Sequence, residues 1–212
     1  MKPYDTEQDK KEQVREMFDR IAPAYDRLNH TLSFQIDKLW RRHVVRIVRR
    51  MQPRRILDVA TGTGDLALAM ARRMRGVQVL GVDLSENMLA EARRKATACG
   101  LDERVVLSLG DAERLEVADA SVDVVTVAFG VRNFGDLGAG LREIARVLKP
   151  GGTFLICNES NGDTDKDEKW TEIIGGMTIY KDVELKTYLE QAGFHDVQIH
   201  KKKSWLCITA WK

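Results

Sequence analysis

The stretch LDVATGTGDLA, residues 57–67, joins an apolar, strand-like segment to a helix-like one. Gly62 and Gly64 allow the backbone to turn sharply there and to come close to a ligand. A glycine-rich turn of this kind also serves as a plain connection between a strand and a helix. The stretch therefore predicts a strand–turn–helix unit, and by itself it leaves open what the turn binds.

Two acids follow at the ends of the next two predicted strands. Asp83 lies about 20 residues beyond the glycine turn, where a carboxylate can accept both hydroxyls of a ribose. The third strand is followed by the triplet GDA at 110–112, in which Asp111 could accept the adenine amine and Ala112 leaves room for the ring. Together with Asp58 in the first strand, this triplet favours an S-adenosylmethionine site over an NAD site. The alternative is that Asp111 is a turn or cap residue.

Beyond the glycine turn, apolar strand-like segments alternate with predicted helices at 65–74, 85–98, 136–148 and 182–192. Such alternation implies right-handed parallel crossovers. The final stretch, 196–211, contains two strands with no helix between them, so one of them must run antiparallel. We therefore expect a class I S-adenosylmethionine-dependent methyltransferase fold. This is an α/β, Rossmann-like sheet of seven mostly parallel strands, with one antiparallel strand near the C-terminus and helices on both faces.

The N-terminal segment 1–52 is predicted to be a helical lid on the substrate side of a Rossmann-like core at 53–212. Its helices are expected at 7–22 and 36–51, with a polar stretch between them. The candidate substrate contacts are Tyr25, Asp26 and Trp40. Plain packing at the helix ends is the alternative.

The arginines of the second predicted helix, 36–51, lie outside its apolar stripe. They could approach an anionic membrane surface. The alternative is an ordinary solvated face.

Composition favours a globular, cytoplasmic protein, with 43% hydrophobic and 31% charged residues. No apolar run approaches the roughly 20 residues that span a bilayer, and the polar N-terminus does not resemble a secretory signal. The three cysteines show no metal or disulfide spacing, so we expect no metal. A net charge of +2 gives no argument for nucleic acid. We expect at most peripheral membrane contact, and a homodimer stays open.

The pieces YDRLN, AFGVRNF and RVLKPGG, with the motifs above, resemble the ubiquinone/menaquinone biosynthesis C-methyltransferase family from about Val14 to Phe154. The resemblance implies S-adenosylmethionine as cofactor and methyl transfer to a ring carbon of a small molecule, a polyprenylated hydroquinone such as demethylmenaquinol. It implies cofactor contacts at Thr63, Asp83, Asp111, Ala112 and Ala128. To these we add Asp58, Gly62, Gly64 and Leu84 as candidates.

Arg132 and Asn133, in the loop after the fourth predicted strand, are the catalytic candidates. A hydroquinone carbon becomes nucleophilic when its ring hydroxyl loses a proton, so a group must accept that proton or stabilise the phenolate. An arginine would hold the phenolate charge or orient a water, because it rarely gives up its own proton. The alternative is that Arg132 pairs with an acid and Asn133 caps the next helix.

After Phe154 the sequence departs from the family. Residues 155–180 stand where the family continues into a long helical segment that covers the substrate, and beyond Arg146 no arginine occurs. Apolar residues of 170–180 could line a smaller pocket or pack the last helix onto the sheet. Three alternatives therefore stay open. The acceptor could be another small-molecule O-, N- or C-nucleophile, the chain could be a hybrid of two parents, or it could be a cofactor-binding scaffold without turnover.

Overall fold

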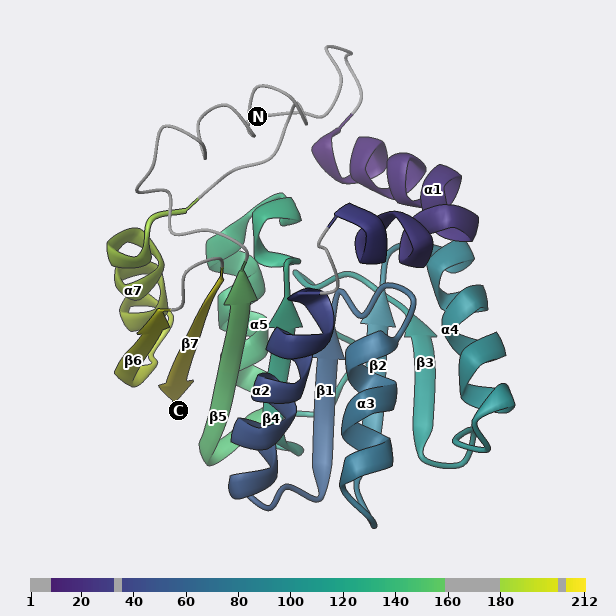
Figure 1. The fold of residues 1–212 in the computed structure, drawn as a ribbon. Helices are drawn as coiled ribbons and strands as arrows, with labels where there is room; N and C mark the ends of the chain where they lie inside the picture. The colour runs from purple at the N-terminus through teal and green to yellow at the C-terminus, as the bar shows by residue number, and fades with distance from the viewer. Residues whose placement is uncertain (1–8, 33–35, 159–179, 202–204) are drawn as a thin grey trace.

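The computed structural model describes residues 9–32, 36–158, 180–201 and 205–212 (Figure 1). Its helices are α1 (Lys10–Leu32), α2 (Ile36–Arg50), α3 (Asp65–Arg73), α4 (Glu86–Ala98), the 3₁₀ turn η1 (Val131–Asn133), α5 (Leu137–Val147) and α7 (Asp182–Gln191). Its strands are β1 (Arg55–Val59), β2 (Gln78–Asp83), β3 (Val105–Leu109), β4 (Val122–Ala128), β5 (Leu148–Asn158), β6 (His195–Lys201) and β7 (Leu206–Trp211). Within these residues, no helix has both the length and the apolar character needed to span a bilayer.

The strands form one seven-stranded sheet in the order β3-β2-β1-β4-β5-β7-β6. Strands β1 to β5 pair in parallel. Strand β7 runs antiparallel to both β5 and β6, which confirms the hairpin predicted from the final stretch of sequence. The carboxyl ends of β1, β2, β3 and β4 consequently meet at one edge of the sheet, where α1 lies across them (Figure 1).

Helices cover both faces of the sheet because its inner strands carry apolar side chains on both sides. Leu57 and Val59 of β1 pack with α5 and α7 in one core cluster. Ile56, which points to the other face, packs with α2 and α3 in a second cluster. The continuous apolar sequence of β1 and β4 therefore places these strands at the centre of the molecule, beneath the edge where a site is predicted.

Helix α1 is longer than the sequence predicts. The sequence predicts that this helix ends at residue 22. That boundary is wrong, because the helix continues through Pro23 to Leu32. An internal proline typically costs about 3 kcal/mol. Contacts beyond it offset that cost: the rings of Tyr25 and Phe18 meet edge to face at 6.0 Å, and Asp26 bonds to Thr63. Tertiary contacts, which no local pattern encodes, thus decide where α1 ends.

Candidate functional site

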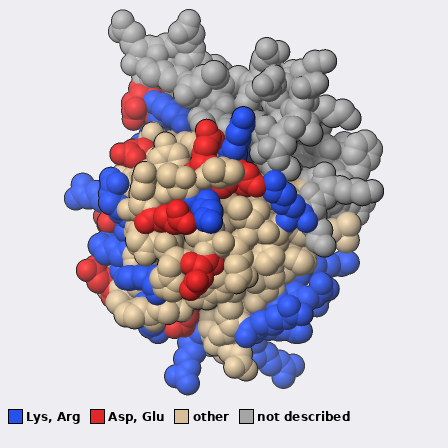
Figure 2. Space-filling model, turned by 90° about the vertical axis from the view of Figure 1, so that its left-hand side faces the viewer, with Lys and Arg blue, Asp and Glu red and all other residues tan. Residues whose placement is uncertain are grey.

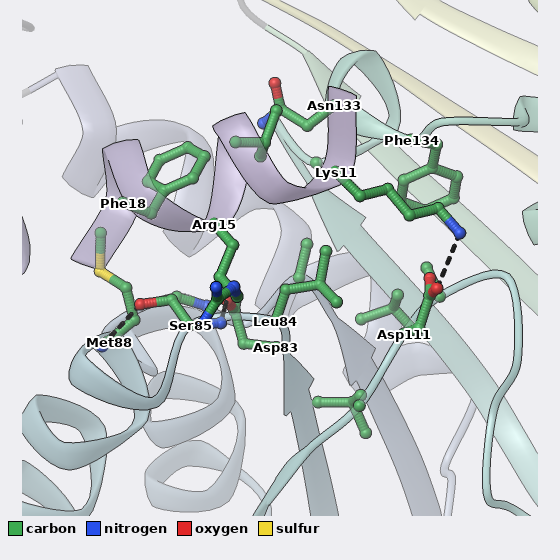
Figure 3. Close-up of a pocket in the computed structure, with 18 of the residues that line it drawn as sticks. Lys11, Arg15, Phe18, Asp83, Leu84, Ser85, Met88, Asp111, Asn133 and Phe134 are labelled. Atoms are coloured by element: carbon green, nitrogen blue, oxygen red, sulfur yellow. Dashed lines mark hydrogen bonds and ion pairs between the residues drawn. The ribbon is translucent and has the colours of Figure 1, made fainter. Parts of the chain in front are cut away.

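A cavity that opens to solvent lies between α1 and the carboxyl ends of the strands. Its wall is made by the turns after β1, β2, β3 and β4, and its roof by one face of α1. Figure 3 shows Lys11, Arg15 and Phe18 projecting from α1 over Asp83, Leu84 and Ser85, with Asp111 to one side. The predicted glycine turn and the two predicted acids therefore converge on one cavity.

Asp83 ends β2 in the cavity wall. Its Oδ2 accepts the Gly62 N–H at 2.8 Å and its Oδ1 accepts the Ser85 N–H at 2.9 Å. Burial raises the pKa of this carboxyl, while those backbone N–H groups act in the opposite direction. The N–H groups of Ser85, Gly62 and Leu84 all act on this carboxyl. Because a carboxylate has about four lone-pair positions, Asp83 keeps the capacity to accept a hydroxyl group from a ligand in the cavity.

Gly62 and Gly64, in the turn after β1, have different structural roles. Gly62 has φ 56°, and a Cβ built there would meet no atom within 4 Å, so the backbone borders open space at the cavity. Gly64 has φ 77°, and a Cβ there would stand 2.9 Å from the Ala92 Cβ of α4. Gly62 therefore leaves room for a ligand, whereas Gly64 permits close packing of the turn against α4.

Asp58 lies beneath this turn and does not line the cavity. Its two oxygens accept hydrogen bonds from Thr126 Oγ1 at 2.5 Å and Thr61 Oγ1 at 2.7 Å. Full burial raises the pKa of Asp58 to about 6, although the two hydroxyl groups oppose that rise. Within the structure, Asp58 joins β4 to the turn after β1 and supports the cavity from below.

Asp111 lines the cavity beside Ala112, in the turn after β3. Its Oδ2 lies 2.8 Å from Lys11 Nζ of α1, and its Oδ1 accepts the Glu113 N–H at 2.9 Å. Lys11 Nζ also lies 2.6 Å from Glu113 Oε2. In this structure Asp111 therefore pairs with a cation of α1 and also holds the turn after β3, which is the role given above as the alternative.

Arg132 and Asn133 form η1, directly after β4, and both line the cavity. The Arg132 guanidinium lies 6.0 Å from the centre of the Phe129 ring. Asp136 caps α5 by accepting the Ala139 N–H at 2.9 Å, so the alternative that Asn133 caps that helix is wrong. Ala128 precedes this loop and also borders the cavity.

The predicted substrate contacts fall into two groups. Tyr25 lines the cavity, whereas Asp26 and Trp40 do not. Asp26 accepts the Thr63 hydroxyl at 2.5 Å and pairs with Lys95 of α4 at 2.8 Å, so it holds α1 to the core, and Thr63 stays outside the cavity wall. The Trp40 ring contacts the Phe129 ring edge to face at 4.8 Å. Phe129 in turn lines the cavity.

Sequence reasoning missed several residues of the cavity wall. Those with side chains that could act on a ligand are Lys11, Arg15, Phe18, Met88, Glu113 and Phe129. Lys11, Arg15 and Phe18 recur with Val14 at helical spacing inside the predicted helix 7–22. Only Tyr25 joins that face when the helix continues through Pro23. Glu113 carried no motif that could have identified it.

Most apolar candidates between residues 170 and 180, including Trp170, lie outside the described residues. Tyr180 is described, and its ring contacts the Tyr188 ring of α7 at 6.0 Å. It also packs against the core cluster beneath α5 and α7. For Tyr180, packing of the last helix is therefore the observed role.

A sequence model of the ubiE/COQ5 methyltransferase family matches residues 6–171, so the resemblance extends beyond the Phe154 limit set from the sequence. A demethylmenaquinone methyltransferase of Bacteroides fragilis is 46% identical over 163 residues, which are 77% of this chain and 66% of that protein. A ubiquinone/menaquinone biosynthesis C-methyltransferase of Geobacter sulfurreducens is 46% identical over 72% of this chain and 60% of its own length. A demethylmenaquinone methyltransferase of Thermus thermophilus is 50% identical over 66% of this chain and 63% of its own length. The chain thus spans less than two thirds of these relatives.

Solved structures share the fold at low sequence identity. The [4+2]-cyclase SpnF superposes with a TM-score of 0.77 at 22% identity, covering 95% of this chain and 96% of its own. A methyltransferase from Thermotoga maritima, described as a possible histamine N-methyltransferase, has a TM-score of 0.72 at 20% identity and covers 93% and 99%. These likenesses and the sheet order confirm the predicted class I methyltransferase fold.

Proposed function

Because the chain belongs to the ubiE/COQ5 methyltransferase family, we propose that it methylates a ring carbon of a demethylmenaquinol-like hydroquinone with S-adenosylmethionine as cofactor. One observation carries the proposal: the glycine turn, Asp83 and Asp111 border a single cavity at the carboxyl edge of the sheet, which is where ligands bind in folds of this kind. The names of the relatives supply the class of acceptor.

The residues around the cavity fit the adenosyl part of the cofactor. Asp83 borders the cavity as a hydrogen-bond acceptor for the ribose hydroxyls, and Asp111 can accept the adenine amine. Gly62 leaves open space beside them. Leu84 and Ala112 add apolar surface to the same wall, which suits the flat base.

The cofactor supplies a methyl group on a positively charged sulfur, which needs no further activation. The protein must therefore hold the acceptor in line and deal with the proton of its ring hydroxyl. Arg132 and Asn133 border the cavity from η1. We propose that Arg132 stabilises the phenolate charge, or orients a water that removes the proton, and that Asn133 donates a hydrogen bond to the same oxygen.

Within the N-terminal segment 1–52, we propose that α1 is the lid over the cavity. Its face toward the cavity carries Val14, Phe18 and Tyr25, and these side chains line the roof. These three side chains exclude water from part of the cavity and offer a surface for the acceptor ring, beside Lys11 and Arg15 of the same roof. Helix α2 packs on α3 in the helical layer of the sheet, and we group it with the core at 53–212.

Two measurements separate the proposed function from its alternatives. Calorimetric titration with S-adenosylmethionine and S-adenosylhomocysteine tests the cofactor site, and we expect both to bind. Incubation with methyl-labelled cofactor and a short-chain demethylmenaquinol then tests the acceptor, and we expect label on the ring carbon. Binding without transfer to the hydroquinone would favour another small-molecule nucleophile or a scaffold, and absence of binding would refute the whole proposal.

We also propose that the protein approaches anionic membranes through α2, since the polyprenylated acceptor is lipophilic. The exposed arginines of this helix are Arg42, Arg46, Arg49 and Arg50. Helix α2 lies in front of the sheet in Figure 1. The front of Figure 1 is the right side of Figure 2, where Lys and Arg side chains gather along the lower edge. Each basic side chain near an anionic surface contributes about 1 kcal/mol.

Vesicle sedimentation tests this surface. The wild-type protein should bind vesicles of phosphatidylglycerol at low salt and bind phosphatidylcholine vesicles weakly. Arg46→Glu combined with Arg49→Glu should abolish the difference, whereas Arg93→Glu combined with Arg94→Glu on α4 changes charge equally and should preserve it. Equal losses for both pairs would show a response to net charge alone and would remove α2 from the role.

A further inference from the structure

Glu113 connects two parts of the cavity that the proposed reaction must coordinate. Its Oε1 accepts the N–H groups of Gly135 and Asp136, at 2.7 Å and 3.0 Å. Its Oε2 lies 2.6 Å from Lys11 Nζ of α1. Because its side chain is only 12% exposed, these bonds form with little competition from water.

The first turn of α1 also bonds to the loop at 130–136, through the carbonyl groups of that loop. Lys10 Nζ donates to the carbonyl oxygen of Phe134 at 2.7 Å and approaches that of Arg132 at 3.4 Å. Burial lowers the pKa of Lys10. The loop that contains Arg132 and Asn133 is therefore fixed by a carboxylate on its N–H groups and by an ammonium on its carbonyl groups.

Lys11 extends this arrangement to the cofactor side of the cavity. Its ammonium bridges Asp111 Oδ2 at 2.8 Å and Glu113 Oε2 at 2.6 Å. Burial alone would lower the pKa of Lys11, but the two carboxylates raise it on balance. Because Asp111 Oδ1 accepts the Glu113 N–H, an adenine amine on Asp111 would compete with Lys11 for Oδ2, and Lys11 would keep Glu113 as its other carboxylate partner.

We propose that Glu113 is a positioning residue for the loop that carries Arg132 and Asn133, and that Lys11 couples this loop to occupancy of Asp111. The inference rests on the proposed function, because it assumes that adenine occupies Asp111 and that η1 faces the acceptor. In this scheme Glu113 itself contacts neither the cofactor nor the acceptor. It acts by holding the two N–H groups that follow Phe134, and Lys11 conveys the state of the adenine site to it.

Hydrogen exchange at residues 130–136 tests the positioning role without any cofactor. Loss of a single buried hydrogen bond to a charged acceptor costs enough to raise local exchange about tenfold. Glu113→Ala should therefore raise the exchange of the Gly135 and Asp136 amides about tenfold. The matched control is Glu116→Gln, because Glu116 is an exposed acid of the same segment, and it should leave these amides unchanged. Unchanged exchange in Glu113→Ala would overturn the positioning role whatever the protein catalyses.

The coupling is tested by adding S-adenosylhomocysteine. In the wild type, the ligand should slow exchange across residues 130–136. In Lys11→Met and in Glu113→Gln, which keep side-chain length, it should still bind within about tenfold of wild-type affinity but no longer slow that exchange. In Glu113→Gln, kcat should fall about tenfold while KM for the cofactor changes little. Ligand-dependent slowing that persists in both variants would refute the coupling, whereas failure of the wild type to bind would refute only the cofactor site and the function built on it.

Discussion

Asp58, next to last in β1, and Asp83, at the end of the neighbouring β2, both support the glycine turn after β1. Their environments nevertheless give them different roles. Asp58 is 2% exposed and its oxygens are occupied by two threonine hydroxyls. Asp83 borders the cavity and holds backbone N–H groups. Both residues are acids, but only Asp83 borders the cavity. Access to the cavity therefore distinguishes the proposed ligand-binding role of Asp83 from the structural role of Asp58.

Asp83→Ala should lower cofactor affinity at least about 100-fold, because each hydrogen bond to a charged acceptor contributes about 1.5–3 kcal/mol and two ribose hydroxyls lose theirs. Calorimetric titration with S-adenosylmethionine measures this. A thermal melt must accompany it, since Asp83 also holds Gly62 and Ser85. Affinity within about threefold of wild type would mean that Asp83 is not the ribose acceptor.

Asp58 should produce a pH dependence of stability. Its folded pKa of about 6 exceeds its ordinary 3.8, so between these values the folded state holds more protons and stability falls as pH rises. The neutral Asp58→Asn lacks this loss. Its unfolding free energy relative to wild type should rise by on the order of 3 kcal/mol from about pH 4 to about pH 7. Urea unfolding across that range measures it, and a constant difference would contradict the assignment.

Arg132→Ala should slow methyl transfer about 100-fold or more while cofactor affinity changes less than about threefold, since Arg132 faces the proposed acceptor side and stabilises charge that develops in the reaction. Steady-state kinetics and calorimetry together measure the two effects. Arg142→Ala is the control, because Arg142 is exposed on α5. Wild-type rates for Arg132→Ala on an accepted substrate would remove Arg132 from the active site.

At the element scale, the turn after β1 and the turn after β4 touch closely. A Cβ on Gly130 would stand 2.5 Å from the Ala60 Cβ and 2.9 Å from Val127 Cγ1. The two turns therefore fit only because Gly130 has no side chain. This contact places η1, with Arg132 and Asn133, directly beside the glycine turn.

Gly130→Ala should destabilise the protein by about 1–3 kcal/mol, because the added methyl group has no space between the two turns. Gly138→Ala in the first turn of α5 is the matched control, where the nearest side-chain atoms lie at 3.2 Å and 3.3 Å. That change should be neutral or stabilising by up to about 1 kcal/mol, since alanine favours a helix. Denaturant unfolding compares them, and equal stability of Gly130→Ala and wild type would contradict the close fit.

The existence of each strand and α-helix followed from sequence, whereas η1 and several boundaries did not. The start of α4 is set locally, because Ser85 precedes an acidic first turn and its Oγ accepts the Met88 N–H at 3.1 Å. The length of α1 could not be predicted, since Asp26 finds Thr63 and Lys95 only in the folded molecule. Local patterns identify elements, and contacts distant in sequence set where they end.

At the scale of the whole molecule, the sheet order explains why one edge carries the site. Strand β1 lies between β2 and β4, so the chain reverses direction across the sheet there, and a crevice opens at the carboxyl ends. Sequence alternation and the closing hairpin predicted a mostly parallel sheet with one antiparallel strand. They also predicted that Gly62, Asp83, Asp111 and the loop of Arg132 follow the carboxyl ends of strands. The lysines of α1 could not be predicted, because the pair between Lys11 and Asp111 joins residues 100 positions apart.

The most direct test of the central claim is a crystal structure of the protein grown with S-adenosylhomocysteine. We predict that the nucleoside lies in the cavity beneath α1, with the ribose hydroxyls on Asp83, the adenine amine on Asp111, and the sulfur directed toward Arg132 and Asn133. A ligand bound elsewhere, or a cavity that stays closed by Lys11 at saturating ligand, would contradict the account.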